Sequence, residues 1–281
     1  MKVGIVFANV GLLGTAEGAE ALALAAEEHG VDSVWTVEHV VVPADYESRY
    51  PYSKDGRMPG GDSSPIPDPL IWLTWVGAHS QRLLLGTGVL ILPQRNPAVL
   101  AKEVATLDQL SGGRVQLGIG VGWLREEFEA LGVPFERRGA RTDEYVAALR
   151  ELWGAVEPTF QGEFVEFERA LSHPKPVRGA VPIVVGGHTP IAARRAGRLG
   201  DGFFPAEHRE LATLLDEMRG AAVAAGRDPE AIEVTTGAPR DAAEWERLSS
   251  LGVDRIVVPP PALTPDDIGP ALGRLMEQLR N

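Results

Sequence analysis

Short apolar runs alternate with helix-like segments along the whole chain. The apolar runs, rich in Val, Ile and Leu, span 3–8, 33–38, 83–91, 115–122, 182–187, 202–206, 232–238 and 255–260. The segments between and after them predict helices over 18–29, 68–80, 97–110, 126–131, 139–153, 189–199, 208–225, 241–250 and 266–279. Continuous apolar runs are typical of parallel strands whose outer faces are covered by helices. Eight such units without a break in composition predict an α/β fold, a (β/α)8 TIM barrel forming a single domain over residues 1–281. A doubly wound sheet is the alternative.

Two segments depart from this repeat. Residues 40–66 are dense in Pro, Gly, Tyr and Asp and follow the second strand. A structureless loop of this length usually acts as a lid or a binding loop, so we expect a mobile lid here. Residues 154–181 carry alternating Phe and Val around Gly162. They predict a short hairpin-like insertion before strand five.

Composition excludes several kinds of site. The 281 residues contain no cysteine, which rules out disulfides and thiolate chemistry. The six histidines show no short ligand spacing, so no bound metal is expected. A net charge of −12 without a basic run argues against nucleic acid and anionic membranes as partners. No apolar run reaches the roughly 20 residues of a membrane span, and the N-terminus is not a signal peptide. We expect a cytoplasmic protein.

Glycines recur at the carboxyl ends of the predicted strands, where the active sites of barrels form. Gly118, Gly120 and Gly122 lie at every second position, which places them on one face of a strand. They do not match the G-x-G-x-x-G turn of dinucleotide-binding folds. Either they allow tight packing inside the barrel, or they leave room for a flat ligand. Gly86 and Gly88 raise the same question one strand earlier.

Polar and aromatic residues follow the same strand ends. Glu38 and His39 end strand two beside the expected lid, so we expect them in the site. Trp123 follows strand four as either a wall for a planar ring or a core residue. Gly186, Gly187, His188 and Thr189 lead from strand five into a helix whose second residue is Pro190. A helix start of this kind binds a phosphate group, or it is an ordinary cap.

Long stretches of the chain resemble the luciferase-like monooxygenase superfamily, in its coenzyme F420-dependent branch. The matching stretches are SVWTVEHVVVP (33–43), the block from LLLGTGVLILPQRNP to YVAALRELW (83–153), HPKPV (173–177) and PIVVGGHTPIAARRAGRLGDGF (182–203). The resemblance implies a (β/α)8 barrel with the deazaflavin ring across its carboxyl-terminal mouth. It also implies a non-proline cis peptide at Gly88-Val89 against that ring.

The resemblance further assigns roles to the strand ends. It implies that Gly120, Gly122 and Trp123 lie beside the ring and that the phosphate binds near Gly186, Gly187, His188 and Thr189. In the sugar-phosphate dehydrogenases of this branch, an acidic residue and a His end strand two, and a Glu follows the glycines of strand four. Glu38 and His39 match the pair, but Trp123 replaces the second Glu, which disfavours a sugar phosphate.

These features predict an F420-dependent oxidoreductase that transfers a hydride between the deazaflavin and a small, fairly apolar molecule. His39 is the best candidate for the proton donor or acceptor. The alternatives are an FMN-dependent monooxygenase and a non-catalytic barrel that only binds F420. A homodimer is also expected.

Overall fold

The structure, a computed structural model, describes residues 1–205 and 207–280. Its strands form a sheet that closes into a barrel, because β3 pairs with β5 as well as with β2. The parallel strands are β1 (Lys2–Val6), β2 (Ser33–Thr36), β3 (Leu84–Thr87), β4 (Leu90–Ile91), β5 (Val115–Gly120), β8 (Ile183–Gly186), β9 (Gly202–Phe204), β10 (Glu233–Gly237) and β11 (Arg255–Val258). β4 continues β3 after a short break, so these nine strands occupy eight strand positions of the barrel. The predicted (β/α)8 fold is therefore confirmed.

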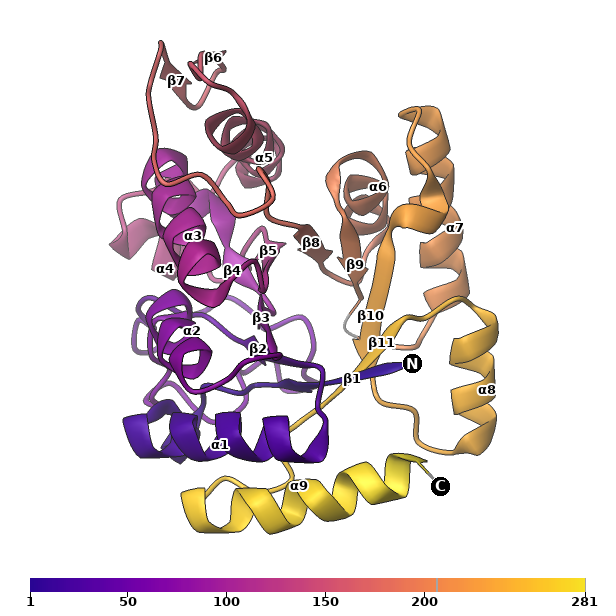
Figure 1. The fold of residues 1–281 in the computed structure, drawn as a ribbon. Coiled ribbons are helices and arrows are strands. Elements are labelled where there is room, and N and C mark those ends of the chain that lie inside the picture. Colours follow the sequence, from indigo (N-terminus) through magenta and orange to yellow (C-terminus); the bar gives the residue numbers. More distant parts are fainter. Residues whose placement is uncertain (206, 281) are drawn as a thin grey trace.

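Helices surround the barrel (Figure 1). They are α1 (Ala16–His29), α2 (Pro69–Ala78), α3 (Pro97–Ser111), α4 (Arg125–Ala130), α5 (Arg138–Gly154), α6 (Pro190–Leu199), α7 (Leu211–Ala224), α8 (Ala242–Ser250) and α9 (Pro265–Arg280), with 3-10 turns η1 (Gly11–Gly14), η2 (Leu92–Gln94) and η3 (Pro229–Ala231). Local sequence sets their ends. Side chains of Thr15, Asp68 and Asn96 accept hydrogen bonds from the first free N–H groups of α1, α2 and α3. None of the helices in the described ranges is both long and apolar enough to cross a bilayer.

Aromatic and branched side chains fill the barrel. Val6, Trp35, Val184, Phe204 and Val257 form this inner cluster, and the rings of Trp35 and Phe204 meet edge to face at 5.5 Å. An added Cβ at Gly86 would lie 2.5 Å from the Trp35 ring. Gly86 therefore makes room for a core side chain and leaves no open space.

The strands differ from the prediction mainly at their ends. The predicted strand 83–91 is interrupted by a cis peptide bond between Gly88 and Val89. β2 stops at Thr36, so residues 37–39 belong to the following loop. The strand predicted over 202–206 ends at Phe204, and its last residue, Ala206, lies outside the described residues.

The insertion before β8 contains the expected hairpin. β6 (Phe160–Gln161) and β7 (Glu166–Phe167) pair antiparallel beyond α5, away from the barrel (Figure 1). The Glu144 carboxylate on α5 accepts hydrogen bonds from the N–H groups of residues 163, 164 and 165 in its turn. The hairpin is therefore anchored to α5 and does not approach the strand ends.

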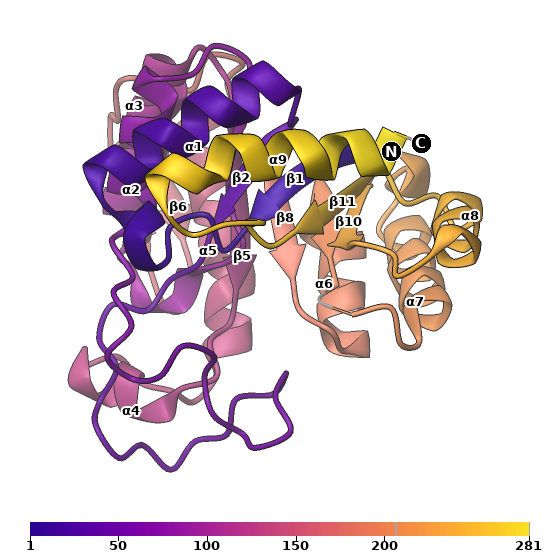
Figure 2. The ribbon, with the colours of Figure 1, turned by 90° about the horizontal axis from the view of Figure 1, so that it is seen from below.

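The long segment between β2 and α2 lies on the same side of the molecule as α4 (Figure 2). This is the side of the carboxyl ends of the strands, because the segment leaves β2 at its carboxyl end and α4 follows that of β5. The residues expected to carry the chemistry lie at the ends of strands on this side or directly after them.

Candidate active site

Hydrogen bonds of Asn9 join the first two strand ends. Its side-chain NH2 group donates to the backbone carbonyls of Val37 (2.9 Å) and Pro67 (3.2 Å). Its side-chain oxygen Oδ1 accepts from the Val37 N–H (2.9 Å). Asn9 is fully buried. It fixes the direction in which the chain leaves β2 and therefore the positions of Glu38 and His39.

Glu38 is buried, and both of its oxygens are engaged. One accepts from the N–H of Ile91 at 2.5 Å, and the other forms an ion pair with Arg95, which also bonds Asp68 at 2.9 Å. Burial raises the pKa of the Glu38 carboxyl, and the neighbouring Arg95 opposes this shift. The carboxylate thus ties β2 to β4 and η2. Its expected catalytic role stays a prediction, and contact with a substrate would require breaking these bonds.

His39 contacts a carboxylate that the sequence did not single out. Its Nδ1 lies 3.0 Å from Oε2 of Glu127, whose side chain on α4 is completely buried. The other oxygen of Glu127 accepts from the N–H groups of Val40 (2.7 Å) and Val41 (3.3 Å). Glu127 lies in a predicted helix only four residues after Trp123, but nothing in the local pattern indicates that it points inward.

Trp123 is the centre of an aromatic cluster. Its ring meets those of His39, Tyr46 and Tyr50 edge to face, with centroids 5.7, 5.5 and 5.3 Å apart. Such pairs stabilise one another beyond their buried area. The indole therefore packs against the lid, and its contact with a cofactor ring stays a prediction.

The peptide bond between Gly88 and Val89 is cis, as the resemblance implied. The Val89 side chain packs against two glycines, because an added Cβ at Gly120 or Gly186 would collide with its methyl groups. A Cβ at Gly122 would meet Phe128 and Ile91. Gly120 in β5, Gly122 just after it and Gly186 in β8 thus accommodate neighbouring side chains. The interpretation that they leave open room for a flat ligand is wrong, and tight packing is the correct one.

Gly118 is the least replaceable of these glycines. A Cβ there would overlap the carbonyl oxygen of Thr87 on the adjacent strand. We expect Gly118→Ala to lower the free energy of unfolding by at least about 1 kcal/mol, because backbone cannot yield as a side chain does. Urea unfolding measures the change. Gly220→Ala on α7, where an added Cβ meets nothing within 4 Å, should be neutral or stabilising. Equal stability of both variants would refute this packing argument.

The turn from β8 into α6 has the features of an anion cradle. Gly187 adopts a φ of +126°, and Thr189 caps α6 by accepting from the N–H of Ala192 at 3.2 Å. Nδ1 of His188 accepts from the N–H of Glu207 at 3.4 Å, whereas its Nε2 is buried and has no partner among the described residues. An unpartnered buried N–H is costly, so this atom favours a ligand that accepts a hydrogen bond.

The lid, residues 40–66, reaches this cradle. The backbone N–H of His188 donates to the hydroxyl of Tyr52, and burial raises the pKa of the Tyr52 phenol. Burial also raises the pKa of Tyr50 to about 12, with Tyr52 as a further cause. Tyr46 and Met58 are buried and joined by a 3.0 Å hydrogen bond from the Met58 N–H to the Tyr46 hydroxyl. The lid is therefore partly packed, at these two residues.

We nevertheless expect the lid to open. It has neither helix nor strand, so few backbone hydrogen bonds oppose its opening. Hydrogen–deuterium exchange should be faster at its amides than in the barrel strands, and bound cofactor should slow it. Protection equal to that of the strands in the free protein would contradict a gate.

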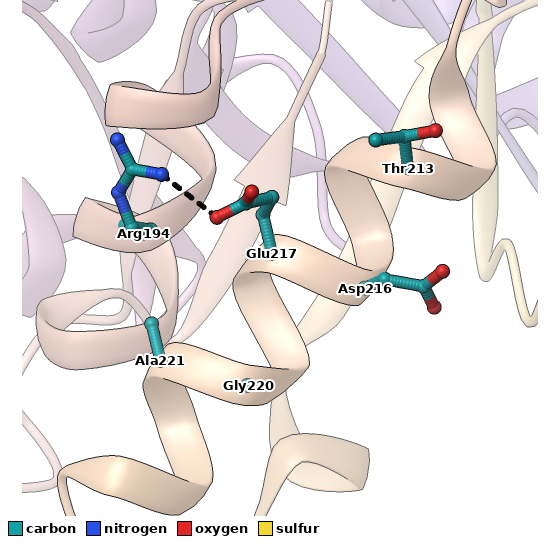
Figure 3. A pocket seen from close by; sticks show the side chains of 6 residues that line it. All are labelled: Arg194, Thr213, Asp216, Glu217, Gly220 and Ala221. Carbon is teal, nitrogen blue, oxygen red and sulfur yellow. Dashed lines mark hydrogen bonds and ion pairs between the residues drawn. The ribbon is translucent and has the colours of Figure 1, made fainter.

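One cavity lies outside the strand-end site. It has a volume of about 410 Å³ between α6 and α7 and is lined by Arg194, Thr213, Asp216, Glu217, Gly220 and Ala221. Figure 3 shows Arg194 paired with Glu217 while Asp216 points away. A smaller cavity of about 200 Å³ borders His39, three valines (40–42) and lid residues 62–64 and 66. Only the second belongs to the strand-end site. The described residues contain no cluster of side chains suited to hold a metal.

Comparison with known proteins places these features in a family. The model of the luciferase-like monooxygenase family matches residues 1–244. An uncharacterized protein of Mycobacterium tuberculosis is 33% identical over 267 residues, which cover 92% of this chain and 93% of that protein. The F420-dependent glucose-6-phosphate dehydrogenase of Nakamurella multipartita is 38% identical over 213 residues, covering 73% of this chain and 58% of that enzyme.

Solved structures agree with this assignment. The monooxygenase RslO1 from Streptomyces bottropensis superposes with a TM-score of 0.76 at 26% identity, covering 100% of this chain and 99% of that one. An F420-dependent secondary alcohol dehydrogenase, in complex with an F420-acetone adduct, superposes with a TM-score of 0.78. Its identity is 20%, over 98% of this chain and 97% of that one, so it supports the fold.

Proposed function

Since this chain belongs to the luciferase-like monooxygenase family, we propose that it is a coenzyme F420-dependent oxidoreductase acting on a small organic molecule in the cytoplasm. The observation that carries the proposal is the arrangement at the strand ends. A histidine paired with a buried carboxylate, the Val89 side chain that fits against two glycines, and an anion cradle all lie at the same barrel mouth. The relative named as an F420-dependent dehydrogenase supports the choice of cofactor.

The residues present fit a cofactor with a phosphate group. Gly187, the Thr189 turn and the unpartnered Nε2 of His188 would hold the phosphate. Binding there would displace the Tyr52 hydroxyl from the His188 N–H. Val89, supported by Gly120 and Gly186, would lie against the ring.

When bound, the deazaflavin supplies or accepts the hydride, and the protein has to orient the substrate and move a proton. His39 is the residue placed to move it, because its Nδ1 is held by Glu127 and it lines the smaller cavity. The valines of that cavity favour an apolar alcohol, carbonyl compound or activated alkene. Trp123 in place of a Glu disfavours a sugar phosphate even though a relative is named for one.

A second candidate is an FMN-dependent monooxygenase. The 26% identity with RslO1 over the whole chain favours it. The two cofactors have rings of the same shape, so the site residues named above would serve either. A barrel that binds F420 without turnover is the third candidate.

Titration of the apoprotein with F420 and with FMN separates these candidates. We expect F420 to bind at least about tenfold more tightly, a difference of about 1.4 kcal/mol. Tighter binding of FMN would favour the monooxygenase. A panel of alcohols, carbonyl compounds and activated alkenes then tests turnover by deazaflavin absorbance. Binding of F420 without any change in its reduction state across the panel would indicate a protein that binds F420 but does not catalyse a reaction.

A further inference from the structure

We propose that Glu127 is a positioning residue that sets the tautomer of His39, holding the proton on Nδ1 and leaving Nε2 as a proton acceptor. This inference rests on the proposed function for its consequence, the oxidation of an alcohol. The tautomer itself is a property of the protein without cofactor. The two can therefore be tested separately.

Hydrogen-bond chemistry determines which nitrogen carries the proton. Glu127 is completely buried, and its Oε1 is already used by the N–H groups of Val40 and Val41. Its Oε2 faces Nδ1 of His39 at 3.0 Å. An ionised carboxylate only accepts hydrogen bonds, so Nδ1 has to be the donor. In a neutral imidazole the other nitrogen then has a free lone pair.

The geometry also fixes how the carboxylate is oriented. Two backbone N–H groups hold Oε1 in place, so the carboxylate cannot turn to present that oxygen to His39 without losing both bonds. The His39 side chain is only 9% exposed, and its ring meets Trp123 edge to face. Nε2, in contrast, has no hydrogen-bond partner among the described residues, and His39 is one of the residues that line the smaller cavity. The open nitrogen is therefore the one available to a substrate.

This tautomer favours alcohols as the substrate class. Oxidation of an alcohol to a carbonyl compound releases a hydride from carbon and a proton from oxygen. Nε2 of His39 would accept the proton, and the hydride would go to the oxidised deazaflavin of the proposed function when it is bound. The buried negative charge of Glu127 then stabilises the resulting imidazolium, as a triad aspartate does.

Glu127→Gln tests the tautomer directly. Because the two N–H groups of Val40 and Val41 retain the amide oxygen, the new NH2 group replaces Oε2 and donates to Nδ1. The proton of His39 should then move to Nε2. Nitrogen-15 NMR of histidine-labelled protein at about pH 8.5, where imidazoles are ordinarily neutral, reports which nitrogen is protonated. A His39→Ala spectrum assigns the signal.

Glu126→Gln is the matched control. Glu126 precedes Glu127 on α4 and accepts from the N–H groups of Glu47 and Ser48, but it makes no bond to His39. We expect Nδ1–H in the wild type and in Glu126→Gln, and Nε2–H in Glu127→Gln. Nε2–H in the wild type, or an unchanged tautomer in Glu127→Gln, would overturn the proposal. If Glu127→Gln fails to fold, the wild-type spectrum decides alone.

Kinetics test the consequence. With an alcohol that the wild type oxidises, Glu127→Gln should lower kcat by about 10²–10⁴-fold while the dissociation constant of F420 stays unchanged. A merely structural role would lower stability and cofactor affinity together and leave the tautomer as it is. Absence of F420 turnover in the wild type would reject the proposed function, yet the NMR result for Glu127 would stand.

Discussion

Replacing His39 with alanine should lower the rate of the chemical step by roughly 10²–10⁴-fold, the usual contribution of a positioned acid or base. The affinity for the cofactor should change far less. His39 contacts Glu127 and Trp123, whereas the proposed phosphate contacts lie at residues 187–189 after β8. Single-turnover measurements at saturating cofactor report the chemical step, and a titration reports the affinity.

His79→Ala provides the control for this variant. His79 caps the end of α2 just before β3, at the opposite end of the barrel, and its Nδ1 bonds the carbonyl of Trp75. It should leave both constants unchanged. If His39→Ala weakens cofactor binding strongly but keeps the wild-type rate at saturating cofactor, His39 is a binding residue. If neither constant changes, the proton has to come from Glu38, His188 or water.

Gly187→Val should weaken cofactor binding by between about 10- and 100-fold. A φ of +126° is accessible essentially only to glycine, and forcing another residue into it costs about 1–3 kcal/mol. A Cβ would also lie 3.0 Å from the Cβ of Ala192. The turn would have to change shape, and the orientation of His188 and Thr189 would change with it. Isothermal titration with F420 measures the loss.

Gly226→Val separates backbone strain from damage to the cradle. Gly226 follows α7 at a φ of +70°, and an added Cβ there meets nothing within 4 Å. This variant should lose stability but bind the cofactor as the wild type does. Unchanged affinity in Gly187→Val, with the protein folded, would mean that the phosphate does not bind at this turn.

Much of the fold could be predicted because it depends on local patterns. The eight apolar runs match the eight strand positions of the barrel, and the alternating Phe and Val of the insertion match the β6–β7 hairpin. The predicted strands differ from the observed ones mainly at their ends, because hydrogen bonding and not hydrophobicity decides where a strand ends. Glu38 and His39 lie beyond β2, and the run 83–91 is divided at Gly88.

The site could be predicted only in part. The resemblance located the cis bond at Gly88-Val89, and the helix start at Thr189 was evident from its sequence. Arg95 as the partner of Glu38 could not be predicted, since the two residues are 57 positions apart. Glu127 was missed for the same reason, because it lies 88 positions from His39 and its burial depends on the fold.

The sequence by itself therefore determined the barrel, the order of its units, the absence of thiol chemistry and the strand ends that carry the candidate residues. These follow from periodicity, composition and chain order. Only the tertiary structure decided what each residue faces. It assigned Gly118 and Gly120 of β5 to Thr87 and Val89, placed Trp123 in an aromatic cluster and brought Glu127 to His39. Such contacts join residues distant in the chain, and only closure of the barrel brings them within a few ångströms.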